Sequence, residues 1–222
     1  MERAGIPFAG AGAILADAAA PALLASPPCS FFALGPFTSG IPPAWAATAT
    51  RPGVALLERM ALSRLKDAVA REKARGRIVV LSVHWGGNWG FEVAPWQREL
   101  AHAWIDAGVD VVQGHSSHHL MGFERYRKRL ILYGCGDFIN DYEGIGGYEE
   151  YFPEFATAFF VELDAEGAVR SVRLYPFRII RMRLNALASE GDAARFRKLL
   201  AAAARFVPFR VRPRENFWEA VW

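Results

Sequence analysis

Histidine follows two apolar stretches of this chain, at the point where each stretch ends. Residues 78–83 precede His84, and residues 109–112 lead into the segment 114–119, which contains His115, His118 and His119. Runs of Val, Ile and Leu are typical of parallel strands buried on both faces, and open α/β sheets bind ligands just beyond the carboxyl ends of such strands. Four of the five histidines therefore lie where a site is expected.

His115 and His118 have the His-x-x-His spacing that can place two imidazoles on one metal ion. Gly114 gives the backbone freedom to fold this loop around a ligand. The alternative is that both histidines only cap backbone groups. His84 by itself is weak evidence for a site, since a histidine after a strand is often half-buried and hydrogen-bonded. If its strand lies beside the His115 strand, however, the rings of His84, His115 and His118 lie at one edge of the sheet.

Oxygen-bearing side chains surround these histidines in the sequence. Asn88, Asp137 and Asn140 are expected to orient the imidazoles or to contact substrate, although each could equally be a turn residue. For Asp141 and Glu143 we favour the turn interpretation. His119 adjoins His118 and is expected to face away from the site, and His102 is expected to pack in the middle of a helix.

Ser116 and Ser117 could in principle be nucleophiles activated by an adjacent histidine. That chemistry requires a residue that orients the base and an oxyanion hole, and the Gly-x-Ser-x-Gly turn of such enzymes is absent. We therefore disfavour acyl transfer.

The composition is that of a globular protein with one domain or two small ones: 222 residues, 52% hydrophobic and 22% charged. The net charge of +3 comes largely from arginines in the part of the chain after Arg170, where they occur one at a time and not in a run. We interpret them mainly as a solvated face and secondarily as a surface for acidic ligands. No nucleic-acid partner is expected. Two widely spaced cysteines and the lack of a recognisable targeting segment or membrane span favour a cytoplasmic setting.

Periodicity and turn residues predict the elements around the histidines. Helices are expected over 14–25, 54–75, 95–107 and 192–206, and strands over 30–35, 129–133, 156–163 and 168–175. The segment 36–52 is expected to be a long loop that is either functional or a surface excursion anchored by Trp45. Alternating strands and helices followed by a hairpin predict an α/β fold with a mixed sheet system and helices outside.

The chain resembles the CapA-type poly-γ-glutamate capsule synthesis proteins, a group within the calcineurin-like metallophosphoesterase superfamily. The resemblance rests on His84-Trp85-Gly86, on Gly114-His115-Ser116-Ser117-His118-His119 and on residues 132–144, and it extends upstream to residues 4–6, 10–12 and 38–48. It implies an α/β/β/α sandwich of the metallophosphoesterase type. It also implies a metal site with His84, His115 and His118 as ligands, a divalent ion (Mn, Zn or Fe) and a phosphorylated or polyanionic substrate.

The sequence departs from the family pattern in two ways. Many relatives have His-Pro-His where this chain has His115-Ser116-Ser117-His118. The opening family segments, a strand ending in Gly-Asp followed by Asn-Leu-Glu and Asn-Asn-His, are not found. We therefore expect residues 1–222 to be a single CapA-like domain that lacks its N-terminal strands. Such a domain would hold one metal ion, and it would need an upstream segment, a partner or a homo-oligomer to cover its exposed edges.

Two functions follow from these expectations. The first is capsule polymer biosynthesis with a metallophosphatase-like, metal-dependent hydrolase site, provided that the missing ligands are supplied. The alternative is a non-catalytic fragment or binding module that supports assembly of an anionic polymer.

Overall fold

The computed structural model describes residues 4–36, 39–57, 62–140 and 145–222, and its centre is a six-stranded sheet. The strand order is β2-β3-β5-β6-β8-β7, with β3, β5, β6 and β8 parallel and the two edge strands antiparallel to their neighbours. The strands are β2 (Ala22–Leu24), β3 (Cys29–Leu34), β5 (Ile78–His84), β6 (Val111–His115), β7 (Phe123–Tyr126) and β8 (Arg129–Leu132).

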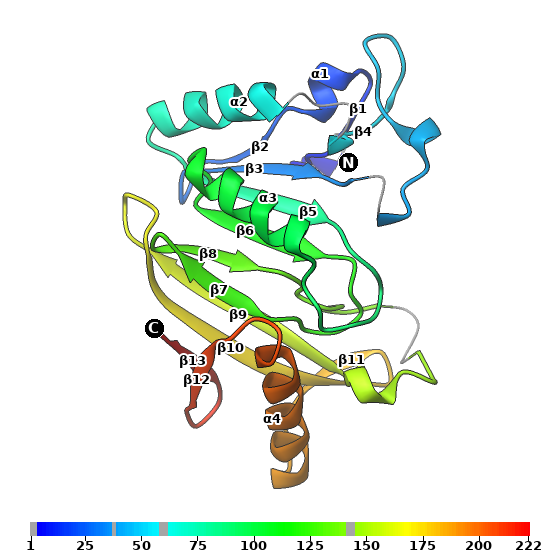
Figure 1. Ribbon diagram of the computed structural model, residues 1–222, viewed down its shortest axis with the longest axis vertical. Coiled ribbons are helices and arrows are strands. Elements are labelled where there is room, and N and C mark those ends of the chain that lie inside the picture. Colours follow the sequence, from blue (N-terminus) through cyan, green and yellow to red (C-terminus); the bar gives the residue numbers. More distant parts are fainter. Residues whose placement is uncertain (1–3, 37–38, 58–61, 141–144) are drawn as a thin grey trace.

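Two helices cover one face of this sheet (Figure 1). They are α2 (Leu62–Ala74) and α3 (Pro95–Asp106). Leu65 and Val69 of α2 and Trp104 of α3 pack against Leu81 and Val83 of β5 in one apolar core. Because side chains alternate along a strand, the odd-numbered residues of β5 face these helices.

A second sheet is built on the long hairpin of β9 (Phe155–Leu163) and β10 (Val169–Ile180). The other edge of β10 pairs with β11 (Arg183–Ala186) and with β13 (Trp218–Val221), and β13 pairs with β12 (Arg210–Pro213). A further core joins this sheet to α4 (Glu190–Ala204) and to the β8 end of the six-stranded sheet, through residues that include Leu132, Leu174 and Phe196.

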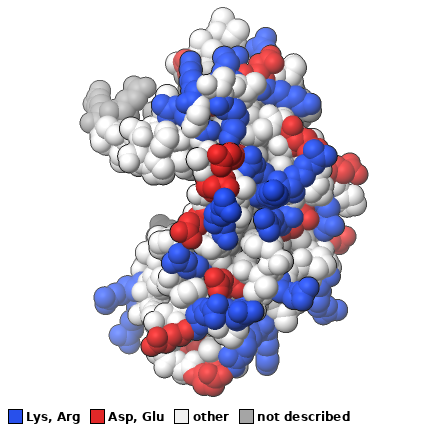
Figure 2. Space-filling view, turned by 90° about the vertical axis from the view of Figure 1, so that its left-hand side faces the viewer, with Lys and Arg blue, Asp and Glu red and all other residues white. Residues whose placement is uncertain are grey.

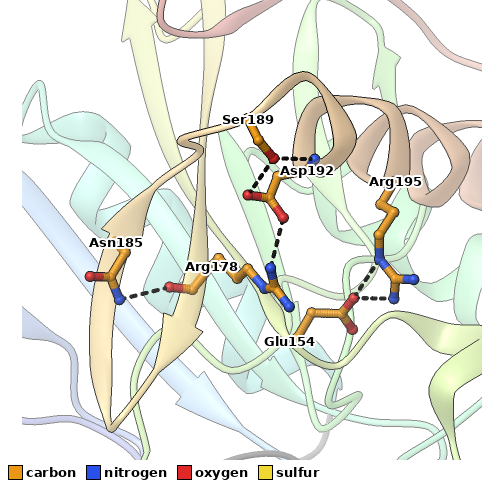
Figure 3. A network of polar contacts seen from close by, with 6 residues as sticks. All are labelled: Glu154, Arg178, Asn185, Ser189, Asp192 and Arg195. Carbon is orange, nitrogen blue, oxygen red and sulfur yellow. Dashed lines mark hydrogen bonds and ion pairs between the residues drawn. The ribbon is translucent and has the colours of Figure 1, made fainter.

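Polar contacts fix the N-terminal end of α4 against the second sheet (Figure 3). Ser189 caps the helix by accepting a hydrogen bond from the Asp192 backbone N–H at 3.1 Å. Arg178 of β10 donates to Asp192 at 2.9 Å, and Arg195 pairs with Glu154. The arginines of this region therefore serve in part to attach a helix to a sheet.

The mixed α/β organisation is confirmed, and three local predictions are wrong. The helix predicted over 14–25 is only α1 (Leu15–Ala18), because Pro21 cannot donate a helical hydrogen bond and the chain continues as β2. The helix predicted from residue 54 is described from Leu62, because Gly53–Val54 form β4 and pair with β1 (Ala11–Gly12). Trp45, in the 3₁₀ turn Pro43–Trp45, is 60% exposed and does not anchor its loop.

None of the helices in the described part of the chain combines the length and apolar character needed to cross a membrane.

Candidate metal centre

The carboxyl ends of β5 and β6 bring two histidines together. His84 and His115 are register partners in the parallel pairing of these strands, so both rings leave the sheet at the same level and on the same side. Their Nδ1 atoms lie 3.2 Å apart, and the ring planes are inclined at 61°. The two Nδ1 atoms share one hydrogen bond, in which one ring donates and the other accepts, so two imidazole nitrogens converge at the edge where the sequence places a site.

The environment of His115 keeps its imidazole uncharged. Burial lowers the pKa of His115 to about 4, and the neighbouring His84 acts in the same direction. A neutral imidazole is the form that binds metal ions. At pH 7, the protonation state of this residue therefore suits a ligand.

A buried tryptophan fixes the loop that follows His84. The indole ring of Trp85 stacks between Trp104, at 5.7 Å, and Tyr133, at 5.9 Å, and the Trp85 backbone N–H donates to the His115 carbonyl oxygen at 3.0 Å. Gly114 lies within β6, and its role is to leave room for the Trp85 indole and the Tyr133 backbone. The expected role of Gly114 in folding the loop around a ligand is therefore wrong.

His118 and Asp137 form a second pair, connected to Asn140. His118 Nδ1 lies 2.8 Å from Asp137 Oδ2, and Asn140 donates to the same carboxylate oxygen at 3.2 Å. A backbone hydrogen bond from the His118 N–H to the Asn88 carbonyl oxygen, at 3.0 Å, holds the loop that carries this histidine. Asn88 thus contributes to the site through its main chain, which a sequence pattern does not reveal.

The backbone between the two histidine pairs has an unusual conformation. Ser116 has φ = 120°, which side-chain-bearing residues rarely adopt. Its hydroxyl donates to the Gly86 carbonyl oxygen at 3.3 Å, and the Ser117 hydroxyl donates to the His119 carbonyl oxygen at 2.9 Å. Because both protons are directed to backbone oxygens, the arrangement does not resemble a serine activated by histidine.

The remaining histidines pack away from this edge. His119 is buried among aromatic rings that include Phe91 and Tyr151, and its Nδ1 bonds to the Leu120 carbonyl oxygen. His102 of α3 contacts the Glu124 carboxylate at 2.7 Å.

The described residues do not complete a ligand set. Within 4–36, 39–57, 62–140 and 145–222, no three His, Cys, Asp or Glu side chains gather closely enough to hold a metal ion. Asp141 and Glu143 lie outside the described residues. Asn140 Oδ1 is buried and has no hydrogen-bond partner among the residues that are described, so an acceptor oxygen is available next to Asp137.

Comparison with known proteins places these features in a family. Residues 1–142 match the family model described as bacterial capsule synthesis protein PGA_cap. The chain is 43% identical over 190 residues to a "Probable polyglutamine synthesis accessory protein" of Mycobacterium tuberculosis, an alignment that covers 83% of this chain and 50% of the relative.

Two bacillar proteins match over shorter lengths. The "Capsule biosynthesis protein CapA" of Bacillus anthracis is 33% identical over 96 residues, which cover 43% of this chain and 23% of that protein. The "PGA biosynthesis protein CapA" of Bacillus subtilis is 37% identical over 73 residues, which cover 33% and 19%. The chain thus spans about half the length of the mycobacterial relative and matches smaller shares of the bacillar ones.

Proposed function

Because the chain belongs to the family of bacterial capsule synthesis proteins, we propose that it is an accessory protein in the biosynthesis of a poly-γ-glutamate-like capsule polymer. We further propose that it acts through a metallophosphatase-like, metal-dependent hydrolase site. The family match and the names of three relatives support the first part. The geometry at the ends of β5 and β6 supports the second.

The observation that carries the hydrolase proposal is the 3.2 Å separation of His84 Nδ1 and His115 Nδ1. Two imidazole nitrogens bound at about 2.0–2.1 Å to one tetrahedral ion would lie roughly 3.3–3.4 Å apart. The two rings therefore already have the spacing of ligands that share an ion. A bound divalent ion would polarise a phosphoryl oxygen and lower the pKa of a bound water molecule.

The other residues of this edge would position groups around that ion. His118, oriented by Asp137, is the proposed third imidazole, and Asn140 fixes the carboxylate in turn. The proposed ion is Mn, Zn or Fe, with one ion held by these residues, and the proposed substrate is a phosphorylated or polyanionic molecule.

The proposal also covers the architecture. We interpret the two large sheets, with α2 and α3 outside one of them, as part of an α/β/β/α sandwich in which residues 1–222 form one domain. Under this interpretation, the site lies at the strand ends, where such folds bind ligands.

Hydrolysis of bis-p-nitrophenyl phosphate with added Mn²⁺ or Zn²⁺ tests the enzyme proposal. We expect metal-dependent turnover that His115→Ala reduces at least about tenfold and that His102→Ala leaves nearly unchanged. His102 is a matched control because it is bonded to Glu124 elsewhere in the fold. Turnover no faster than in buffer, or equal activity of the His115→Ala variant, would refute a hydrolase site at these residues.

A second candidate is a non-catalytic module that binds an anionic polymer. It is favoured by the lack of a three-ligand cluster in the described part of the chain, and by exposed arginines on β12, including Arg210 and Arg212. This function predicts binding of fluorescent poly-γ-glutamate that weakens with salt and with Arg210→Glu plus Arg212→Glu. Arg64→Glu, on α2, is the control. Absence of binding at low ionic strength would exclude this candidate.

A further inference from the structure

A cavity of about 450 Å³ lies between helices α1 and α2, and none of its lining residues belongs to the candidate metal centre. Its volume falls within the roughly 300–1,000 Å³ that is typical of small-molecule pockets. Helix α1 and the residues after it contribute apolar side chains, among them Leu15, Ala19 and Pro21. One side of the cavity can therefore pack against the hydrocarbon part of a ligand.

Helix α2 contributes the charged side of the cavity. Arg64 and Arg71 are seven residues apart, which is close to two helical turns, so both lie on the same face of the helix. Asp67 lies on this face between them. Figure 2 shows Lys and Arg side chains gathered over the upper part of the molecule, where α2 lies, with some Asp and Glu side chains among them. The cavity thus presents a positive, a negative and a second positive group in order along the helix.

These three side chains do not neutralise one another. Spacings of three and four residues on a helix allow ion pairs, and Asp67 has such spacings to both arginines. In the described part of the chain, however, the ion pairs of α2 are made by Glu72 and Lys73, and none by the three side chains that line the cavity in this order. Their charges are therefore available to a ligand.

The other charged residues of the cavity are already paired. Glu72 is 4% exposed, accepts a hydrogen bond from Ser30 Oγ at 2.7 Å and forms an ion pair with Arg75. Its carboxylate also lies 3.7 Å from Arg77 Nε. Because two guanidinium groups already balance this carboxylate, it does not offset the charge of Arg71. Among the described lining residues, two guanidinium groups and one carboxylate remain for a ligand.

We infer that this cavity binds an acidic α-amino acid, such as glutamate. In glutamate the ammonium group lies between the two carboxylates, so the molecule has the order negative, positive, negative. This order is complementary to Arg64, Asp67 and Arg71. Each guanidinium group donates hydrogen bonds to one carboxylate of the ligand, and Asp67 accepts from its ammonium group. The methylene groups of the ligand pack against the apolar side chains of the α1 side.

This inference does not depend on metal binding or on hydrolysis at His84 and His115. Interior residues of a poly-γ-glutamate chain have no ammonium group, so the cavity is also separate from the polymer-binding surface proposed around Arg210 and Arg212. Failure of either candidate function leaves the inference intact, and its failure leaves both candidate functions intact.

Titration of the isotope-labelled chain with L-glutamate at low ionic strength, followed by the chemical shifts of backbone amides, tests the inference. We expect saturable binding with the largest shift changes in α1 and α2. Glutarate lacks the ammonium group and γ-aminobutyrate lacks one carboxylate. Each should bind at least about tenfold more weakly, because each loses a charge-assisted contact. Absence of saturable glutamate binding, equal binding of glutarate, or shift changes confined to other elements would overturn the inference.

Matched substitutions locate the ligand. Arg64→Gln, Asp67→Asn and Arg71→Gln each remove one charge from the cavity and should weaken glutamate binding at least about tenfold. Lys66→Gln removes a charge from the same helix outside the cavity and should have no effect. All four positions are exposed, so we expect folded variants, which their melting temperatures check. Binding that withstands all three cavity substitutions, or that Lys66→Gln weakens equally, would refute the inference.

Discussion

The indole Nε1 of Trp85 donates a hydrogen bond to the Tyr133 carbonyl oxygen, 2.9 Å away, and this bond passes the backbone of Gly114. A methyl group at position 114 would collide with both bonded atoms. We expect Gly114→Ala to lower the free energy of unfolding by about 2–4 kcal/mol, because the Trp85 loop and strand β6 would have to separate. Urea denaturation measures the loss.

Gly87→Ala is the control for this prediction. Gly87 is exposed, and a Cβ there would make only an ordinary contact, 3.6 Å from the Trp89 carbonyl oxygen. We expect a change within about 0.5 kcal/mol. Equal effects of the two substitutions would contradict the role assigned to Gly114.

Metal binding should depend on the register pair of β5 and β6. We expect His84→Ala and His115→Ala each to remove detectable binding of Zn²⁺ or Mn²⁺ in isothermal titration calorimetry, since one imidazole cannot replace two converging nitrogens. His102→Ala should bind like the original chain. Unchanged affinity in either of the first two variants would mean that the ion binds elsewhere.

The carboxylate of Asp137 should influence the metal through His118. Asp137→Asn keeps the shape of the side chain but weakens its hold on His118 Nδ1, which lies 2.8 Å away. We expect metal affinity to fall about 10- to 100-fold, the range for groups that orient a ligating imidazole. Titration calorimetry of the variant, with its melting temperature as the folding control, tests this expectation. No loss of affinity would show that the Asp137 carboxylate does not influence the ion through His118.

Two histidines make the stability of the metal-free protein depend on pH. Burial lowers the folded-state pKa of His115 to about 4, and burial also lowers the pKa of His119. An unfolded histidine has a pKa of about 6.5, so the unfolded state binds more protons between these values, and stability must fall as the pH drops from about 6.5 towards 4.

Urea midpoints measured between pH 7.5 and 4.5 in the presence of a chelator test this dependence. His115→Gln and His119→Gln should each flatten the curve, because each removes a histidine whose folded-state pKa is lowered. A pH-independent midpoint of the original chain over this interval would contradict the burial argument.

Elements with strong local signals are predictable from the sequence. The apolar run of β5, the periodic pattern of α3 and the turn between β9 and β10 all lead to correct elements. Strands β7 and β11 escape prediction because their hairpin turns lack the usual Asn-Gly signal. Arg127-Lys128 and Arg181-Met182 instead adopt positive φ angles without glycine. The strand pairing around such turns determines their conformation.

The candidate site shows the same division between sequence and structure. The sequence by itself placed histidines after two strands, and the family resemblance assigned them to a metal centre. The spacing of the histidines in the sequence pointed first to the pair His115 and His118, three positions apart. The structure instead brings His115 into contact with His84, 31 positions away. Only the parallel register of β5 and β6 decides this, because hydrogen bonds between distant segments determine which side chains lie at the same level of the sheet.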